Sequence, residues 1–106
     1  MDITPIIKAS VQINNGRTEK EIALYLSSEA GEVADWLLNP QKRKEALHGE
    51  CADVIICAVD LAIQHAINQF PDADPELVAG MAISSLETQI RTKSEKWRGK
   101  SDGSIR

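Results

Sequence analysis

The sequence predicts an all-α domain built from four helices, which assembles with further copies of itself. Apolar residues recur at spacings of three and four through most of the chain, as in helices that bury one face. Helix start and stop signals at Thr18-x-x-Glu21, Asn39-Pro40 and Pro75 divide the chain into such segments. No segment shows a convincing strand pattern of alternating apolar and polar residues. A four-helix, bundle-like arrangement follows from these patterns.

The first two helices have clear boundary signals. The first should begin near residues 4–5, with a proline at an early helical position, and should stop at the turn signal of residues 14–16. The second should span residues 19–38, because Thr18 and Glu21 form a capping box before it. Its apolar stripe consists of residues at helical spacing: Ile22, Leu26, Ala30, Val33 and Leu37.

The third helix should begin between residues 41 and 44 and end before Pro71. From residue 51 onward nearly its whole circumference is apolar, which indicates burial on nearly all sides. A chain of 106 residues offers too few helices to cover it within one subunit. We therefore expect a homodimer or homotetramer in which this helix contacts another subunit through Ile55, Ile56, Val59 and Ile63.

The fourth helix should begin with Asp74 as N-cap and Pro75 as its first residue. Its seam for packing against the other helices is Ala79, Ile83, Leu86, Ile90 and Trp97. The domain should then comprise residues 1–98, and residues 99–106 should form a frayed C-terminal tail.

The charge and the cysteines limit the possible functions and locations. A formal net charge of −4 argues against a general binder of nucleic-acid polymers or of membrane surfaces. The most apolar run is interrupted by Asp53 and Asp60 and is too short to span a bilayer. Cys51 and Cys57 lie on one helix, where their side chains point in different directions and cannot pair. Together with the lack of a signal-peptide pattern, this predicts a cytoplasmic protein.

Two acidic pairs dominate the centre of the chain, Glu29-x-x-Glu32 and Glu50-x-x-Asp53. Residues three apart share a face of a helix, so each pair presents two carboxylates in one direction. The midpoint of 32 and 50 is 41, and so is the midpoint of 29 and 53. A chain that folds back near residue 41 would place the four carboxylates together, where they would repel one another strongly without a cation. Mg²⁺ is the natural partner for such oxygen ligands.

Acidic pairs are also common on solvated helix faces, where they bind nothing. The second pair, however, is set in an apolar helix, where ionised groups are costly unless they are paired or bound to a metal. Gly31 and Gly49 lie beside these carboxylates, and each glycine costs a helix ~1 kcal/mol relative to alanine. Close backbone approach or space for a ligand would explain that cost. These features favour a metal site over coincidental surface charge.

The two motifs, Glu29-Ala-Gly-Glu32 and Glu50-Cys-Ala-Asp53, resemble the signature of the MazG-like all-α nucleoside triphosphate pyrophosphohydrolases. The resemblance covers the second and third helices and, more loosely, the basic end of the fourth. It implies a MazG-type fold and hydrolysis of (d)NTP to (d)NMP and pyrophosphate, with a role in nucleotide-pool house-cleaning. It also implies that the four acids hold Mg²⁺, with Mn²⁺ as a substitute, and act as the catalytic groups. In one departure, Ser28 stands where the family often has a further glutamate before the first motif.

The residues that contact the substrate are less clearly marked. Lys93, Lys96 and Arg98 either clamp the β- and γ-phosphates or are cations favoured by a helix C-terminus. Trp36 either stacks on the base or packs in the core. Asp60 either supports the metal site or pairs with a basic residue of a neighbouring subunit.

A different class of function is also open. The chain could be a non-catalytic helical oligomer, a regulatory or antitoxin-like partner whose acidic face binds a basic surface. The four acids would then be recognition charges, and lowering Mg²⁺ would change little. For the enzyme, metal would be required for binding, and the four acids would act as one unit.

Overall fold

The computed structural model describes residues 1–13 and 16–101. This part of the chain is all-α and contains no strand, which confirms the predicted fold class. One 3₁₀ turn, η1, separates the second and third helices. The elements in chain order are α1 (Thr4–Gln12), α2 (Glu19–Leu38), η1 (Pro40–Lys42), α3 (Leu47–Gln69) and α4 (Pro75–Ser101).

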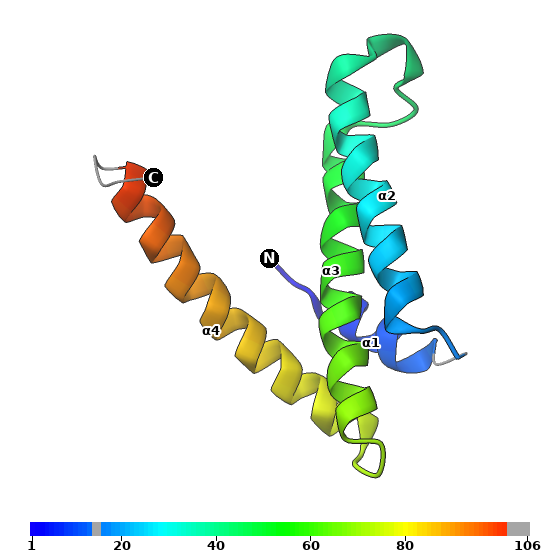
Figure 1. Ribbon diagram of the computed structural model, residues 1–106, viewed down its shortest axis with the longest axis vertical. Helices are drawn as coiled ribbons and strands as arrows, with labels where there is room; N and C mark the ends of the chain where they lie inside the picture. The colour runs from blue at the N-terminus through cyan, green and yellow to red at the C-terminus, as the bar shows by residue number, and fades with distance from the viewer. Residues whose placement is uncertain (14–15, 102–106) are drawn as a thin grey trace.

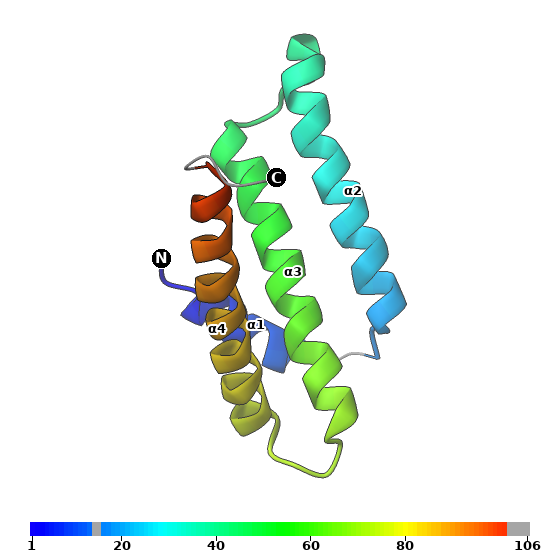
Figure 2. The same cartoon turned by 60° about the vertical axis from the view of Figure 1, so that its left-hand side comes forward.

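The third helix is the centre of the molecule. α2 and α3 run antiparallel as a long hairpin, and α1 crosses the end of α3 that is distant from η1 (Figure 1). α4 starts at that same end and then diverges from α3, so that its C-terminal half stands away from the hairpin. α3 contacts each of the other three helices, whereas α2 and α4 do not touch in the part of the chain that is described. Figure 2 shows α2 and α4 on opposite sides of α3.

The hydrophobic core lies between α1, α3 and α4. Its buried members are Val59, Ile63, Ala79 and Ile83, and around them pack Ile6, Ile7 and Val11 of α1 and Ile3, which precedes that helix. Val59 is only 5% exposed and Ile63 is fully buried, so the expectation that they face another subunit was wrong. α1 and the first half of α4 cover this side of α3 within one protomer. Of the four expected interface residues, only Ile56 remains exposed.

Most predicted helix boundaries are confirmed. α2 spans the predicted residues, and its capping box is formed: Glu21 N donates to Thr18 Oγ1 at 3.1 Å, and Thr18 N donates to Glu21 Oε1 at 3.4 Å. α1 ends at Gln12, and Gly16 has the positive φ of a turn glycine; the predicted stop at Asn14 and Asn15 lies outside the described residues.

Two boundaries differ from the prediction. α3 begins at Leu47 and not between residues 41 and 44, because η1 and an extended segment that includes Arg43 precede it. α4 continues through residues 99–101, which were expected to belong to the tail, and residues 102–106 lie outside the described part.

A buried polar network ties α1 to α3. Asp60 accepts hydrogen bonds from Ser10 Oγ at 2.5 Å and from Arg17 Nη2 at 3.2 Å. Gln64 Nε2 donates to both the backbone and hydroxyl oxygens of Ser10, at 2.9 and 3.0 Å. Asp60 therefore finds its basic partner within its own chain and not in a neighbouring subunit. Pairing with Arg17 offsets the cost of burying its charge.

The seam predicted along α4 is buried only in its first half. Ala79 and Ile83 lie in the core, whereas Ile90 and Trp97 are more than half exposed, because α4 has diverged from α3 by that point.

The described helices can also be compared with the dimensions of a lipid bilayer. No described helix combines the length and the apolar character needed to cross a bilayer.

Candidate metal site

The acidic pairs meet because α2 and α3 fold back on each other at η1. Glu29 and Glu32 lie one turn apart on α2, and Glu50 lies near the start of α3. Each of the three side chains offers one carboxylate oxygen, and these oxygens all lie within 4.8 Å of one another. The convergence expected from the sequence is therefore present in the structure.

Asp53 belongs to a second, overlapping group of carboxylates. Oxygens of Asp53, Glu50 and Glu45 lie within 4.8 Å of one another, and Glu50 is common to both groups. The two groups together form what we call the carboxylate cluster: Glu29, Glu32, Glu45, Glu50 and Asp53. The structure thus brings the four predicted acids together and adds a fifth.

Two oxygens of the cluster are buried without a partner. Glu50 is only 8% exposed, and its Oε2 has no hydrogen-bond partner; the same is true of the buried Glu29 Oε2. Most buried polar atoms in proteins are hydrogen-bonded, because an unpaired one loses its hydration without compensation. A cation would satisfy both atoms. A donor set of carboxylate oxygens alone suits hard divalent ions such as Mg²⁺ and Mn²⁺.

The electrostatics of the cluster point the same way. Burial raises the pKa of Glu50 to about 7, assisted by a hydrogen bond and the negative charge of Glu45 and by the charges of Glu32 and Asp53. Burial also raises the pKa of Glu29, and the charges of Glu32 and Asp53 add to this effect. Without a cation, the folded protein therefore disfavours full ionisation of its own cluster.

Glu45 was not among the predicted site residues, although the glycine at position 49 indicates where its side chain lies. Glu45 precedes α3 on a bend, and its side chain folds back over the first turn of that helix. A Cβ at position 49 would lie 1.9 Å from Glu45 Oε1, so the glycine leaves space for this carboxylate. Nothing comparable explains Gly31, since no atom lies within 4 Å of the position its Cβ would take.

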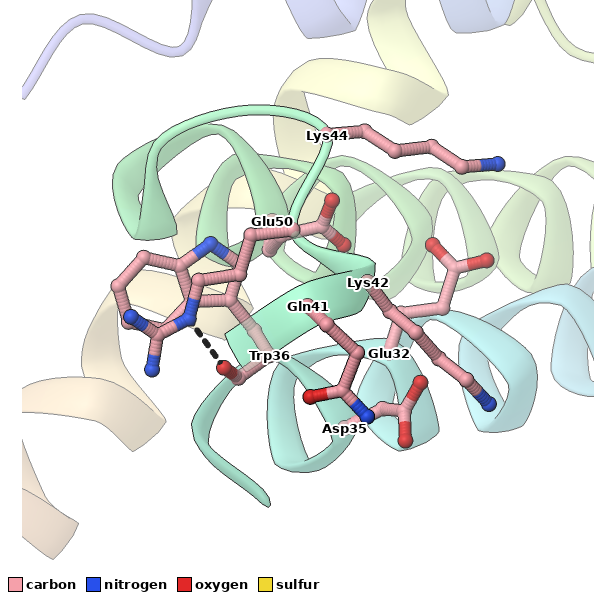
Figure 3. A pocket seen from close by; sticks show the side chains of 8 residues that line it. Glu32, Asp35, Trp36, Gln41, Lys42, Lys44 and Glu50 are labelled. Carbon is pink, nitrogen blue, oxygen red and sulfur yellow. Dashed lines mark hydrogen bonds between the residues drawn. The ribbon is translucent and has the colours of Figure 1, made fainter. Parts of the chain in front are cut away.

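A pocket of about 380 Å³ opens beside the cluster, between the end of α2 and the segment that leads into α3 (Figure 3). Glu32 and Glu50 form its acidic wall. The remaining lining comes mainly from residues 39–46, which we call the connecting loop, and includes three positively charged side chains. The lining outside the acidic wall consists of Asp35, Trp36, Gln41, Lys42, Arg43 and Lys44.

Trp36 belongs to the wall of this pocket and not to the hydrophobic core. Its Nε1 donates a hydrogen bond to the backbone oxygen of Glu45 at 2.8 Å. The guanidinium of Arg43 lies 3.7 Å from the centre of its ring, and Arg43 Nε donates to the backbone oxygen of Trp36 at 2.6 Å. Arg43 thus covers one face of the ring, so a base could stack only on the other.

The basic residues predicted to clamp phosphate do not reach the pocket in this protomer. Lys93, Lys96 and Arg98 lie on the exposed second half of α4. As a whole, α4 contacts α3 and α1 but not α2 among the described residues. None of them lines the pocket. The reason is the divergence of α4 from α3 (Figure 1), which no local periodicity encodes. The positively charged side chains at the pocket come instead from the connecting loop.

No protein-family model, curated protein or solved structure matches this chain. Function is therefore inferred from the geometry of the site and from the two acidic motifs.

Proposed function

We propose that this protein is a Mg²⁺-dependent nucleoside triphosphate pyrophosphohydrolase of the MazG-like kind, which converts (d)NTP to (d)NMP and pyrophosphate. Mn²⁺ would substitute for Mg²⁺. Removal of unwanted nucleotides from the cytoplasmic pool would be its role. Support comes from the resemblance of the two acidic motifs to that family and from the meeting of both motifs beside a pocket that is also lined by lysine and arginine side chains.

The observation that carries the proposal is the state of Glu50. Its side chain is buried between two groups of carboxylates, and its Oε2 has no hydrogen-bond partner. A surface recognition charge would be exposed to water, and a purely structural carboxylate would be paired. A buried carboxylate that has one oxygen without a partner, and that lies among other carboxylates, is the arrangement expected of a metal ligand.

Each residue of the cluster has a role in this proposal. Glu29, Glu32, Glu50 and Asp53 would hold Mg²⁺, which when bound neutralises phosphate charge and lowers the pKa of a coordinated water. Glu32 and Glu45 are exposed, so water can reach their carboxylates, whereas Glu50 is buried. Glu45, or Glu32 where it is not fully committed to the metal, can accept the proton of the water that attacks the α-phosphorus.

We also propose that the protein acts as a homodimer or homotetramer. A second copy lying along α4 would remove from water a set of large apolar side chains that are more than half exposed in the protomer: Leu77, Met81, Ile90 and Trp97. Such an assembly could bring Lys93, Lys96 and Arg98 of one subunit over the carboxylate cluster of another. They would then add to the positive charge at the substrate.

The test is a screen of the common NTPs and dNTPs with Mg²⁺, in which released pyrophosphate is measured. Turnover should require the metal and should stop with EDTA. In ¹⁸O-labelled water, attack on the α-phosphorus places the label in the nucleoside monophosphate. Label in orthophosphate would indicate attack on the γ-phosphorus and would overturn the proposed reaction.

A control separates this enzyme from a non-catalytic binding protein. Glu50→Gln should abolish pyrophosphate release, whereas Glu87→Gln, on the exposed part of α4, should leave it unchanged. If no nucleotide is hydrolysed, and if Mg²⁺ neither binds nor stabilises the fold, the acidic face is a recognition surface.

A further inference from the structure

We infer that Lys42 and Lys44 bind the polyphosphate of the substrate and that Trp36 and Arg43 hold them in place. This inference rests on the proposed function, which it extends by naming the residues that select a chain of phosphates. It moves the phosphate-binding role from the C-terminal half of α4 to the connecting loop.

The two lysines share the pocket with the acidic wall. In Figure 3 the side chains of Lys42 and Lys44 extend in the same direction, on either side of the Glu32 carboxylate, while Trp36 lies on the opposite side of the loop. Within the described ranges, neither lysine forms an ion pair with a carboxylate. Both ammonium groups therefore remain available to a ligand.

Arg43, between the two lysines, has a different task. Its backbone is extended, with φ −68° and ψ 121°, and adjacent side chains of an extended segment point to opposite sides. Its guanidinium is committed to Trp36, through the ring at 3.7 Å and through the backbone oxygen at 2.6 Å. Trp36 Nε1 in turn holds the backbone of Glu45 at 2.8 Å.

These contacts fix the connecting loop on both sides of Lys44. We call the three contacts between Trp36, Arg43 and Glu45 the loop clasp. A loop that is ordered before the ligand arrives loses less conformational entropy on binding than a mobile one. The clasp therefore positions the two lysines, whereas Trp36 and Arg43 need not touch phosphate themselves.

The chemistry of the pocket identifies the ligand class. One wall is made of carboxylates, which repel an anion unless a cation lies between them, and the other wall carries free ammonium groups. A polyphosphate bound to Mg²⁺ meets both requirements, because its oxygens share the cation with the carboxylates and still present negative charge to the lysines. The volume of about 380 Å³ lies within the usual range for small-ligand pockets.

The inference is tested by calorimetric binding of inorganic tripolyphosphate in the presence of Mg²⁺. Lys42→Gln and Lys44→Gln should each weaken binding roughly tenfold, as expected for the loss of one hydrogen bond to a charged group. Lys20→Gln, at the other end of α2, is the matched control and should change the affinity less than about twofold. Unchanged affinity in the double variant, or no binding by the parent protein, would overturn the inference.

Substitutions of Arg43 distinguish a role in positioning the loop from direct contact with phosphate. If it only holds the loop, Arg43→Lys should weaken tripolyphosphate binding as much as Arg43→Gln, because lysine keeps the charge but not the planar group that stacks on Trp36. Loss of the clasp should also change the fluorescence of Trp36, which a Trp97→Phe background isolates. Normal binding by Arg43→Lys, together with weak binding by Arg43→Gln, would show that Arg43 contacts phosphate directly and would contradict its positioning role.

The outcomes also distinguish this inference from the proposed function. If tripolyphosphate binds through Lys42 and Lys44 but no nucleotide is hydrolysed, the inference stands and the proposed reaction fails. If nucleotides are hydrolysed and the double lysine variant keeps the parent KM, the proposed reaction stands and the inference fails.

Discussion

The carboxylate of Glu45 occupies the space that a side chain at position 49 would need. A Cβ on Gly49 would lie 1.9 Å from Glu45 Oε1 and 2.7 Å from Glu45 Cδ. This relationship places Glu45 beside Glu50 and explains why a helix that carries part of the site tolerates a glycine in its first turn. It also makes Gly49 a means of removing Glu45 from the cluster without altering any carboxylate.

Gly49→Ala should therefore displace the Glu45 side chain, which is long enough to move aside. The variant should gain up to ~1 kcal/mol in free energy of unfolding from helix propensity. It should also bind Mg²⁺ more weakly, because one carboxylate has left the cluster. Chemical unfolding in EDTA and Mg²⁺ titration measure the two effects.

Gly31→Ala is the matched control for that prediction. No atom lies within 4 Å of the position its Cβ would take, so the variant should gain a similar stability and keep the parent affinity for Mg²⁺. Equal Mg²⁺ affinities in the two alanine variants would show that Glu45 is not part of the metal site.

Replacing Glu50 by Gln should abolish turnover while the fold remains intact. Gln keeps the volume of the side chain but lacks the charge that would hold Mg²⁺, and Glu32→Gln should act in the same way. In EDTA at neutral pH, Glu50→Gln should melt at a higher temperature than the parent, because a repelling charge is gone. Near-normal pyrophosphate release by either purified variant would contradict the assignment of the cluster as the catalytic site.

Without metal, the protein should lose stability as the pH rises. The pKa of Glu50 is raised from 4.5 to about 7 in the folded protein, chiefly by burial and then by Glu45. The folded state therefore binds more protons than the unfolded chain between these two values, and its stability declines over that interval. The shift of Glu29 has the same sign.

Thermal unfolding in EDTA at pH 5 and pH 8 measures this effect. The hydrogen bonds of Glu19 to Asn68 and His65 lower the pKa of Glu19, so its contribution is lost only at more acidic pH and does not mask the change. Glu50→Gln should flatten the profile between pH 5 and 8. Saturating Mg²⁺ should reverse its slope, since the metal binds the ionised cluster. A parent profile that rises between these pH values in EDTA would show that the cluster does not repel itself.

Val59→Asp and Ile56→Asp should separate folding from assembly. Val59 is 5% exposed in the core of the protomer, so an aspartate there buries an unpaired charge, and we expect loss of helical circular dichroism. Ile56 lies nearly one turn away on α3 and is 45% exposed, so Ile56→Asp should remain folded. A folded Val59→Asp variant would show that Val59 does not lie in the hydrophobic core.

Light scattering on the parent and on Ile56→Asp then reports the assembly. A parent mass well above 11.6 kDa that falls towards this value in the variant would place Ile56 in a subunit interface. A parent mass of 11.6 kDa at micromolar concentration would show that the protein is a monomer and would overturn the proposed oligomer.

The sequence by itself determined the all-α class, the bounds of α2 and the meeting of the acidic pairs. The capping box at Thr18 and Glu21 and the stop at Asn39 are local signals, and local hydrogen bonds place the ends of α2 where the sequence predicts them. The convergence of Glu29 and Glu32 with Glu50 needs only the rise of two helices and a turn midway between them. The rise follows from helix geometry, and Pro40, the first residue of η1, marks the turn.

Only the tertiary structure decided what surrounds the cluster. Glu45 and the lysines of the connecting loop lie outside the α-helices, so no helical periodicity predicts where their side chains point. Contacts with Trp36 and Gly49 place the loop. The burial of Val59 depends on α1 and α4 covering one side of α3, and the distance of Lys96 from the pocket depends on the divergence of α4. Both result from packing between segments far apart in the chain, which local sequence patterns do not encode.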